Sequence, residues 1–279
     1  MAKRPIAVWM GSYREAPSYT NASEPASQMS GVHQSPTQPA PYLEDEHEVR
    51  VGSIPIESLT AHFQPVVSLR SGKTFGFSAI AYCDREDLSS LEELYARAAF
   101  EKKVGELGRA VRTAATSECP GSPVFISVHP HELKEAWLIR PDDPLYGHDA
   151  EVFLQVNQQS FSPMCAHVLS EVCSRSGVGL VLDDFGGGAS NLRQLIELSP
   201  AFVRLSHDLA LGIERSARKR VVVTALVQMC LDLGAQVLAQ GIETEIEARV
   251  LMECGVAYGS GPIMGEPTEA PRISHWRAR

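Results

Sequence analysis

The sequence contains no hydrophobic run of the roughly 20 residues that a bilayer-spanning helix needs. In the opening stretch MAKRPIAVWMGSY, a basic pair precedes an apolar patch that is too short for a secretory signal, and no small-residue cleavage site follows it cleanly. We therefore expect a cytoplasmic protein that has no membrane partner.

The sequence also lacks paired cysteines and an excess of positive charge. No two of its six cysteines form a C-x-x-C pair, which predicts reduced thiols rather than a disulfide framework or a zinc site; they are Cys83, Cys119, Cys165, Cys173, Cys230 and Cys254. The net charge of −9 argues against nucleic acid as the main partner, because phosphate backbones bind faces rich in Lys and Arg.

Aliphatic side chains are scarce from residue 12 to about residue 48, as SEPASQMSGVHQSPTQPAPYLEDEHE shows. Such a segment buries too little apolar surface to offset chain entropy, so we predict a disordered Pro/Ser-rich tail over residues 1–48. The patch IAVWM at residues 6–10, which contains Trp9, is an exception. It is either a frayed end or a short peptide that docks on a partner or on the folded domain.

From residue 50 onward, strand-like apolar runs alternate with amphipathic helix-like runs. Buried strands are predicted at 124–128, 152–156, 179–184, 202–206 and 236–242. Capping boxes predict helix starts at Ser90 and Thr244, and Gly234 and Gly255 stand where glycines end helices. This alternation predicts a parallel sheet with helical crossovers, either an open doubly wound sheet or a closed barrel.

Polar residues fall near the carboxyl ends of these strands, where ligands bind in both architectures; they are Asp183, Asp184, Arg204 and Gln240. The glycines at 186–188 follow the two aspartates, but the dinucleotide fingerprint G-x-G-x-x-G fails at Asn191. Two carboxylates beside a pyrophosphate would also repel it without a metal. We interpret these glycines as a tight turn from strand to helix.

The segment DDFGGGASNL resembles the DDFGTGYSSL segment of EAL domains, the phosphodiesterases that cleave cyclic di-GMP. Further segments are similar to the family in the same order: FQPVVSLRSGKTFGFSAIAY (63–82), FISVHPHEL (125–133), FLQVNQQS (153–160), VRLS (203–206) and VLAQGIETEIEARVLMECGVAYGSGPIMGEP (237–267). The resemblance implies a TIM-like (β/α)8 barrel with an antiparallel first strand. It would form a domain over residues 49–279, after the predicted tail.

The resemblance also implies where the family holds its metals and its general base, and most of those positions differ here. Ser78 stands at the acid of the E-A-L motif, Ser127 and Gln155 at the next metal ligands, and Gln240 at the base. The full set of vestigial site positions is Ser78, Ser127, Gln155, Gln158, Asp183, Asp184, Arg204, Gln240 and Glu243. Neutral amides and hydroxyls neither offset two divalent ions nor accept a proton. We therefore expect no catalysis, and neither magnesium nor manganese as a cofactor.

Two interpretations of Asp183 and Asp184 remain open: a single bound metal, or hydrogen bonds to Arg204 and to the backbone of their own turn. The second is favoured, since buried acids need partners and Arg204 lies at the end of an adjacent strand. Gln155, Asn157 and Gln240 would join this polar network. His129 and His131 are expected on opposite faces rather than at a metal, and the basic residues near 215–220 are expected to be a solvated face.

Three functions follow from these residues. The first is a non-catalytic EAL-like signalling domain of a bacterial regulatory pathway that acts by protein contact, with a homodimer left open. The second is a cyclic di-GMP receptor that does not hydrolyse its ligand, with candidate contacts at Gln64, Tyr82, Arg204, Tyr258 and Pro267. Tyr82 and Glu266 replace family arginines, which disfavours a dianion. The third is a residual phosphodiesterase.

Overall fold

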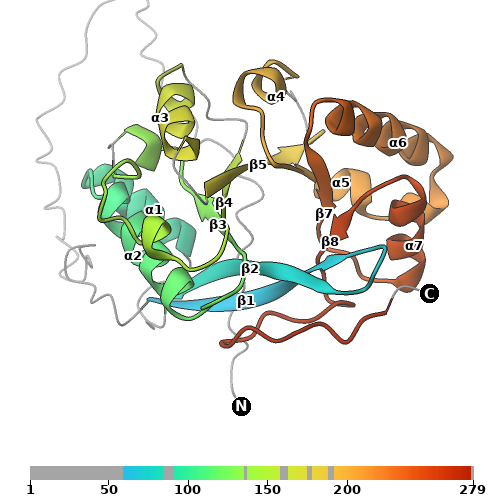
Figure 1. Ribbon diagram of the computed structural model, residues 1–279, viewed down its shortest axis with the longest axis horizontal. Helices are drawn as coiled ribbons and strands as arrows, with labels where there is room; N and C mark the ends of the chain where they lie inside the picture. The colour runs from blue at the N-terminus through green and yellow to red at the C-terminus, as the bar shows by residue number, and fades with distance from the viewer. Residues whose placement is uncertain are drawn as a thin grey trace, which may run out of the picture.

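The computed structural model describes residues 59–83, 91–134, 137–157, 163–174, 178–187 and 192–277. The predicted tail with Trp9, the capping box at Ser90, and Gln158 lie outside the described residues. Eight strands close into a barrel in chain order (Figure 1). They are β1 (Leu59–Ser68), β2 (Thr74–Cys83), β3 (Val124–Val128), β4 (Val152–Asn157), β5 (Val178–Phe185), β6 (Phe202–Leu205), β7 (Gln236–Ala239) and β8 (Tyr258–Gly259).

The first strand runs against both of its neighbours. β1 pairs antiparallel with β2 and with β8, whereas every pairing from β2 through to β8 is parallel. A tight turn joins β1 to β2, and Gly72 adopts a left-handed conformation there at φ 68°. The predicted closed barrel with an antiparallel first strand is confirmed. We call the end at which the parallel strands finish the mouth of the barrel.

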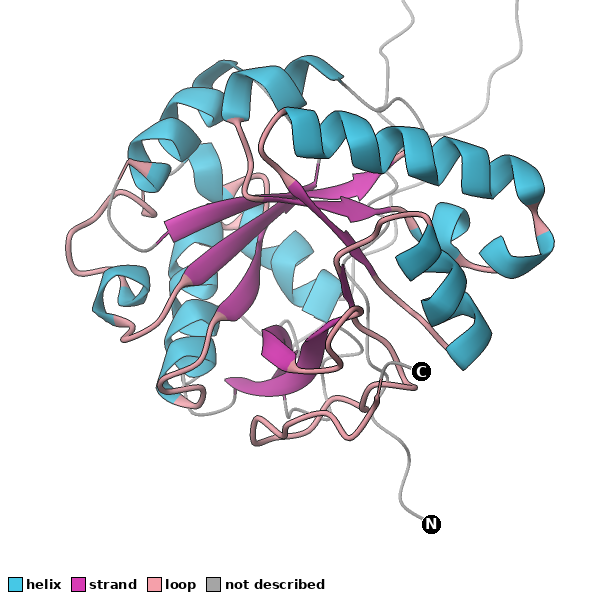
Figure 2. Ribbon diagram, turned by 45° about the vertical axis from the view of Figure 1, so that its right-hand side comes forward, coloured by secondary structure: helices cyan, strands magenta, loops and turns pink. Residues whose placement is uncertain are grey.

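Helices surround most of the barrel, as Figure 2 shows. They are α1 (Leu91–Phe100), α2 (Val104–Ser117), α3 (Pro163–Cys173), α4 (Leu192–Leu198), α5 (His207–Ala210), α6 (Ala217–Asp232) and α7 (Glu245–Glu253), with 3-10 turns η3 (Glu132–Lys134), η4 (Pro144–Gly147) and η6 (Ile213–Arg215). The Thr244 capping box is present, and Gly234 and Gly255 have left-handed φ angles of 85° and 90°. The predicted strand at 236–242 is shorter, because Gly241 turns the chain at φ 74°.

Aromatic rings fill the barrel at the end where the parallel strands begin. Phe125 of β3 stacks on Phe153 of β4 at 4.7 Å, and Phe153 meets Phe202 of β6 edge-on at 5.0 Å. Phe75 of β2 and Tyr258 of β8 complete this aromatic floor. Because alternate residues of a strand face the same side, the next inward residues towards the mouth are Ser127, Gln155 and Arg204. The floor therefore supports a polar layer above it.

A buried ion cluster outside the barrel ties three segments together. Arg112 of α2 bonds Glu132 of η3 and, at 2.8 Å, Asp143 before η4, and all three side chains are at most 1% exposed. Burial raises the pKa of Glu132, although Arg112 opposes this rise. A Cβ at Gly108 would clash with the Glu132 carboxylate, so glycine lets helix α2 lie directly against it.

The segment after β8 runs along the outer side of the β1–β2 hairpin (Figure 1). Thr268 and Phe63 exchange backbone hydrogen bonds of 2.7 and 3.2 Å, and Ser274 is anchored to Thr74 and to the Met264 carbonyl. All six cysteines are free thiols, as predicted. Across the part of the chain that the structure describes, no helix has both the length and the hydropathy to cross a membrane.

Candidate functional site at the barrel mouth

A hydrogen-bonded polar layer lies above the aromatic floor. Ser127 Oγ donates to Gln155 Oε1 at 3.0 Å, and Arg204 Nη1 donates to the same oxygen at 3.2 Å. Arg204 also donates from Nε and Nη2 to the two carboxylate oxygens of Asp183. The layer is therefore a continuous chain across β3, β4, β5 and β6.

The predicted pairing of Asp183 with Arg204 is present as a bidentate ion pair. Both side chains are more than 90% buried, so each charge needs the other in this poorly solvated interior. The planar guanidinium matches the two carboxylate oxygens, which an ammonium group does not do. A divalent cation at this place would have to displace Arg204 from Asp183.

Asp184 differs from its neighbour. Asp183 has both predicted kinds of partner, Arg204 and the backbone N–H of Asp184 at 2.7 Å. Of the two aspartates Arg204 binds Asp183, and the Asp184 carboxylate accepts no hydrogen bond from the described residues; its predicted contact with the rest of the glycine turn lies outside them. Burial, with the nearby Asp183 and Asp208 charges, raises the pKa of Asp184 to about 6, although Arg204 opposes the rise. Asp184 also has a left-handed φ of 55°, which is rare outside glycine.

Glycine makes room for the Asp184 side chain. A Cβ at Gly187 would lie 2.7 Å from Asp184 Oδ1, and the Gly187 amide donates to the Asp184 carbonyl at 3.2 Å. Gly186 is left-handed at φ 92°. The described part of this glycine run therefore forms the tight turn that the sequence predicts, with no fingerprint for a dinucleotide.

Two buried polar groups of the layer lack partners among the described residues. They are Gln155 Nε2 and Ser206 Oγ, and their residues are 3% and 2% exposed. Gln155 is expected to form hydrogen bonds at both ends of its amide. Its oxygen accepts two of them, whereas its nitrogen has no partner among the described residues. Gln240 lies half-buried directly after β7. Its amide has no basic lone pair that could take a proton from water.

The candidate cyclic di-GMP contacts are spread over both ends of the barrel. Gln64 is buried on β1 and donates to the Gly265 carbonyl at 3.1 Å, next to half-buried Pro267. Tyr82 lies near the mouth end of β2, and its ring contacts that of His62 at a tilt of 36°, with the ring centroids 4.2 Å apart. Burial raises the pKa of Tyr82. Tyr258 instead belongs to the aromatic floor, away from the polar layer.

A carboxylate that the sequence did not single out for the site positions the loop after β7. Glu247 of α7 accepts hydrogen bonds from the backbone N–H groups of Glu243 and Thr244 at 3.1 Å and of Gly212 at 3.2 Å. Burial alone would raise the pKa of Glu247, but these three donors hold it below its usual value. Glu243 itself is exposed. The capping box in the sequence predicts the hydrogen bond from Thr244 to Glu247, but not the one from Gly212, which lies 35 residues away.

The prediction that His129 and His131 lie on opposite faces is wrong, because residues two apart in a strand share a face and because both histidines here lie in a turn. β3 ends at Val128, and the two rings meet edge-on at 5.2 Å. His129 Nδ1 accepts from the His131 backbone N–H at 3.2 Å. Of the basic residues after 214, Arg215 pairs with Glu214 and Lys219 binds the Leu211 carbonyl, while Arg218 and Arg220 are exposed.

Comparisons with known proteins agree with this geometry. The cyclic di-GMP phosphodiesterase RocR of Pseudomonas aeruginosa is 23% identical over 74% of this chain and 57% of its own length. The blue light- and temperature-regulated antirepressor BluF of Escherichia coli is 23% identical over 73% of this chain and 53% of its own length. Among solved structures, the manganese and cyclic di-GMP complex of Klebsiella pneumoniae BlrP1 superposes with a TM-score of 0.66 at 22% identity, over 78% of this chain and 58% of that one.

The chain spans between 16% and 57% of the length of the curated relatives that it matches. The model of one family, the EAL domain, matches residues 53–267, which include every strand of the barrel and the whole polar layer. On this match, and with the barrel topology described above, the chain belongs to the EAL domain family.

Proposed function

We propose that this protein is a non-catalytic EAL domain that acts in the cytoplasm by binding another protein. The observation that carries the proposal is the bidentate pair of Arg204 with Asp183. It puts a fixed positive charge among the groups that would have to hold metal ions.

The donor set around this pair fits two divalent cations poorly. Ser78, Ser127 and Gln155 are neutral, and both oxygens of Asp183 are engaged by Arg204. A divalent cation about 4 Å from a guanidinium is repelled by about 8 kcal/mol at an effective dielectric constant of about 20. Asp184, with its pKa raised to about 6, is the remaining described carboxylate of the Asp-Asp pair, and one carboxylate does not replace the hydration of two ions.

A protein partner is supported by the surface and by one relative. Exposed aliphatic side chains lie on α4 and α6, among them Ile196 at 66% and Val221 at 70% exposure. Exposed apolar side chains mark protein contacts, including those of homodimers, where they gather into a contiguous patch. The relative BluF is named as an antirepressor, and that name supports the proposal of a protein partner.

A cyclic di-GMP receptor is the alternative function. It is favoured by Gln64, whose buried side chain is held in place by the Gly265 carbonyl beside Pro267, and by the ligand of the BlrP1 complex. Against it stand the exposed acid Glu266 and the uncharged Tyr82, because a dianionic ligand needs positive partners.

Calorimetric titration with cyclic di-GMP separates the two functions. We expect no binding tighter than about 10 μM, which corresponds to about 7 kcal/mol, with or without manganese. An Arg204→Lys variant serves as a matched control, since it keeps the charge but loses the bidentate geometry. Tighter binding by the unmodified protein would contradict action through protein contact alone and favour the receptor.

A further inference from the structure

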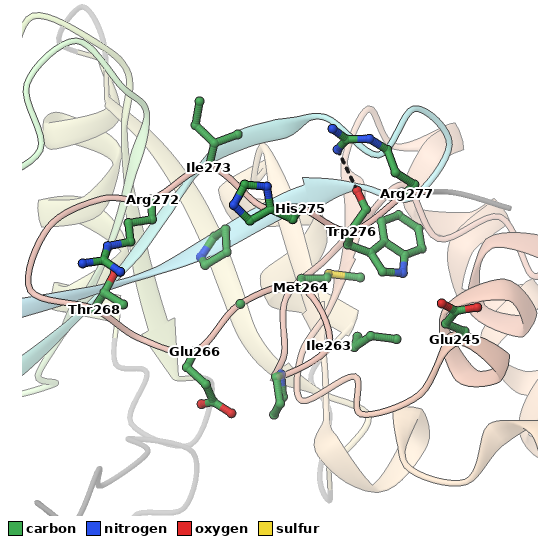
Figure 3. Close-up of a pocket in the computed structure, with 13 residues that line it drawn as sticks. Glu245, Ile263, Met264, Glu266, Thr268, Arg272, Ile273, His275, Trp276 and Arg277 are labelled. Carbon is green, nitrogen blue, oxygen red and sulfur yellow. Dashed lines mark hydrogen bonds between the residues drawn. The ribbon is translucent and has the colours of Figure 1, made fainter.

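A pocket of about 540 Å³ lies outside the barrel, between the segment after β8 and the start of α7 (Figure 3). Its volume is in the range of pockets that hold small ligands or short peptide segments. Figure 3 shows that Thr268 and Arg272 lie at one end, whereas Met264, Ile263, Trp276 and Glu245 gather at the other. The Thr268 end is therefore polar and carries Arg272 and Glu266, whereas the other end is apolar and has Glu245 and Arg277 at its rim.

The apolar end has side chains that a second segment of chain would cover. Met264 is 2% exposed and forms part of the core, and half-buried Ile263 and Trp276 pack against that core. Trp276 Nε1 is buried and has no hydrogen-bond partner among the described residues. At the rim, the exposed Glu245 has no ion pair within the described part of the chain.

The wall that bears Trp276 is held in place. Ser274 is 3% exposed, its amide donates to Thr74 Oγ1 at 2.9 Å, and its hydroxyl donates to the Met264 carbonyl at 2.5 Å. The Trp276 amide then donates to Ser274 Oγ at 3.1 Å. The indole is therefore presented by anchored backbone, which lowers the entropic cost of binding at this end.

We propose that residues 3–10 of this chain, KRPIAVWM, dock in the apolar end of this pocket. Its aliphatic side chains and Trp9 would pack on the half-buried Ile263 and Trp276, and a backbone carbonyl would accept from Trp276 Nε1. Lys3 and Arg4 would reach the Glu245 carboxylate. IAVWM is the most apolar five-residue stretch within residues 1–48, whereas the stretch LEDEHE offers a single aliphatic side chain to this apolar end.

The connection is long enough for this contact. Pro65, which lines the pocket, lies six residues along β1 from Leu59, about 20 Å at about 3.3 Å per residue. The intervening residues 11–58 comprise 48 residues. A chain of that length can extend to roughly 160 Å, so it is long enough to bring residues 3–10 to the pocket. This inference does not depend on the proposed function.

Photo-crosslinking in the full chain tests the docking. Trp9 is replaced by photoreactive benzoylphenylalanine, and the products are mapped by mass spectrometry, with the same replacement at Tyr19 as a control. We expect crosslinks within one chain from position 9 to residues 262–276, and no such products from position 19. Crosslinks to other faces of the barrel, or a crosslinked dimer band, would overturn the proposal.

A charge reversal adds a matched pair of variants, whose folding is checked by thermal melting. Glu245→Arg is expected to lower the crosslink yield about two- to fivefold, the effect of losing an exposed ion pair. Adding Lys3→Glu and Arg4→Glu on that background is expected to restore the yield. If the crosslink yield is the same in both variants as in the unmodified chain, the assigned orientation of the segment is wrong.

Discussion

At the scale of single residues, the mouth of this barrel is organised by one arginine. Arg204 binds both oxygens of Asp183 and shares Gln155 Oε1 with Ser127. Ser127 and Gln155 are neutral, and Arg204 balances the buried Asp183 carboxylate. The polar layer is therefore a hydrogen-bonded network in which the buried acid is paired with the buried base.

Removing one partner of this pair should be costly. Arg204→Met leaves the Asp183 charge buried and unpaired, so the free energy of unfolding should fall by about 3–5 kcal/mol. Asp183→Asn combined with Arg204→Met should recover most of that loss, because no charge then remains buried. Urea denaturation of both single variants and the double variant measures the coupling, and strictly additive losses would show that the two residues do not stabilise each other.

Asp184 gives a pH-dependent prediction. Its folded pKa of about 6 lies above the usual carboxyl value, so ionisation weakens the folded state. The stability that Asp184 contributes is fully present below about pH 4 and is lost as the pH rises through about 6. Asp184→Asn should therefore raise the melting temperature at pH 7.5 by more than at pH 4, and Asn also tolerates the left-handed φ. An equal gain at both pH values would contradict the shifted pKa.

At the scale of elements, the barrel strands are easier to predict than the contacts between helices and loops. Each predicted strand is a short apolar run, so β3 to β6 fall within two residues of their predicted bounds. The Asp183–Arg204 pair follows from two adjacent strands. By contrast, Glu247 meets Gly212 across 35 residues, and Arg112 meets Glu132 and Asp143 across 20 and 31. No local pattern marks such partners before the loops are placed.

The Arg112 cluster holds α2 against η3 and η4, and this can be measured against a control on the same helix. Arg112→Leu should lower the free energy of unfolding by about 3–5 kcal/mol, since it leaves the buried Glu132 and Asp143 carboxylates without their positive partner. Arg109→Leu, which removes the pair with the exposed Asp142, should cost about 1 kcal/mol or less. Similar losses in chemical denaturation would mean that the buried cluster adds nothing beyond a surface pair.

At the scale of the whole molecule, the residues that build the barrel are different from those that form the polar layer at its mouth. The aromatic floor and the apolar contacts between strands and helices build the barrel, and none of these residues belongs to the polar layer. We therefore expect substitutions in the polar layer to leave the barrel topology intact. The order of strands and helices leaves an open sheet and a closed barrel both possible, and the resemblance to EAL domains selects the barrel. The environment of Asp184 and the pocket beside Trp276 require the three-dimensional placement of loops.

The central claim is that this barrel does not turn over cyclic di-GMP. The most direct measurement incubates the full chain with cyclic di-GMP and excess manganese, and then separates cyclic and linear dinucleotides by chromatography, with RocR as the positive control. Because Arg204 occupies Asp183 and Gln240 accepts no proton, we predict no linear product above the protein-free background. Linear product that accumulates with time and with protein concentration would contradict the account.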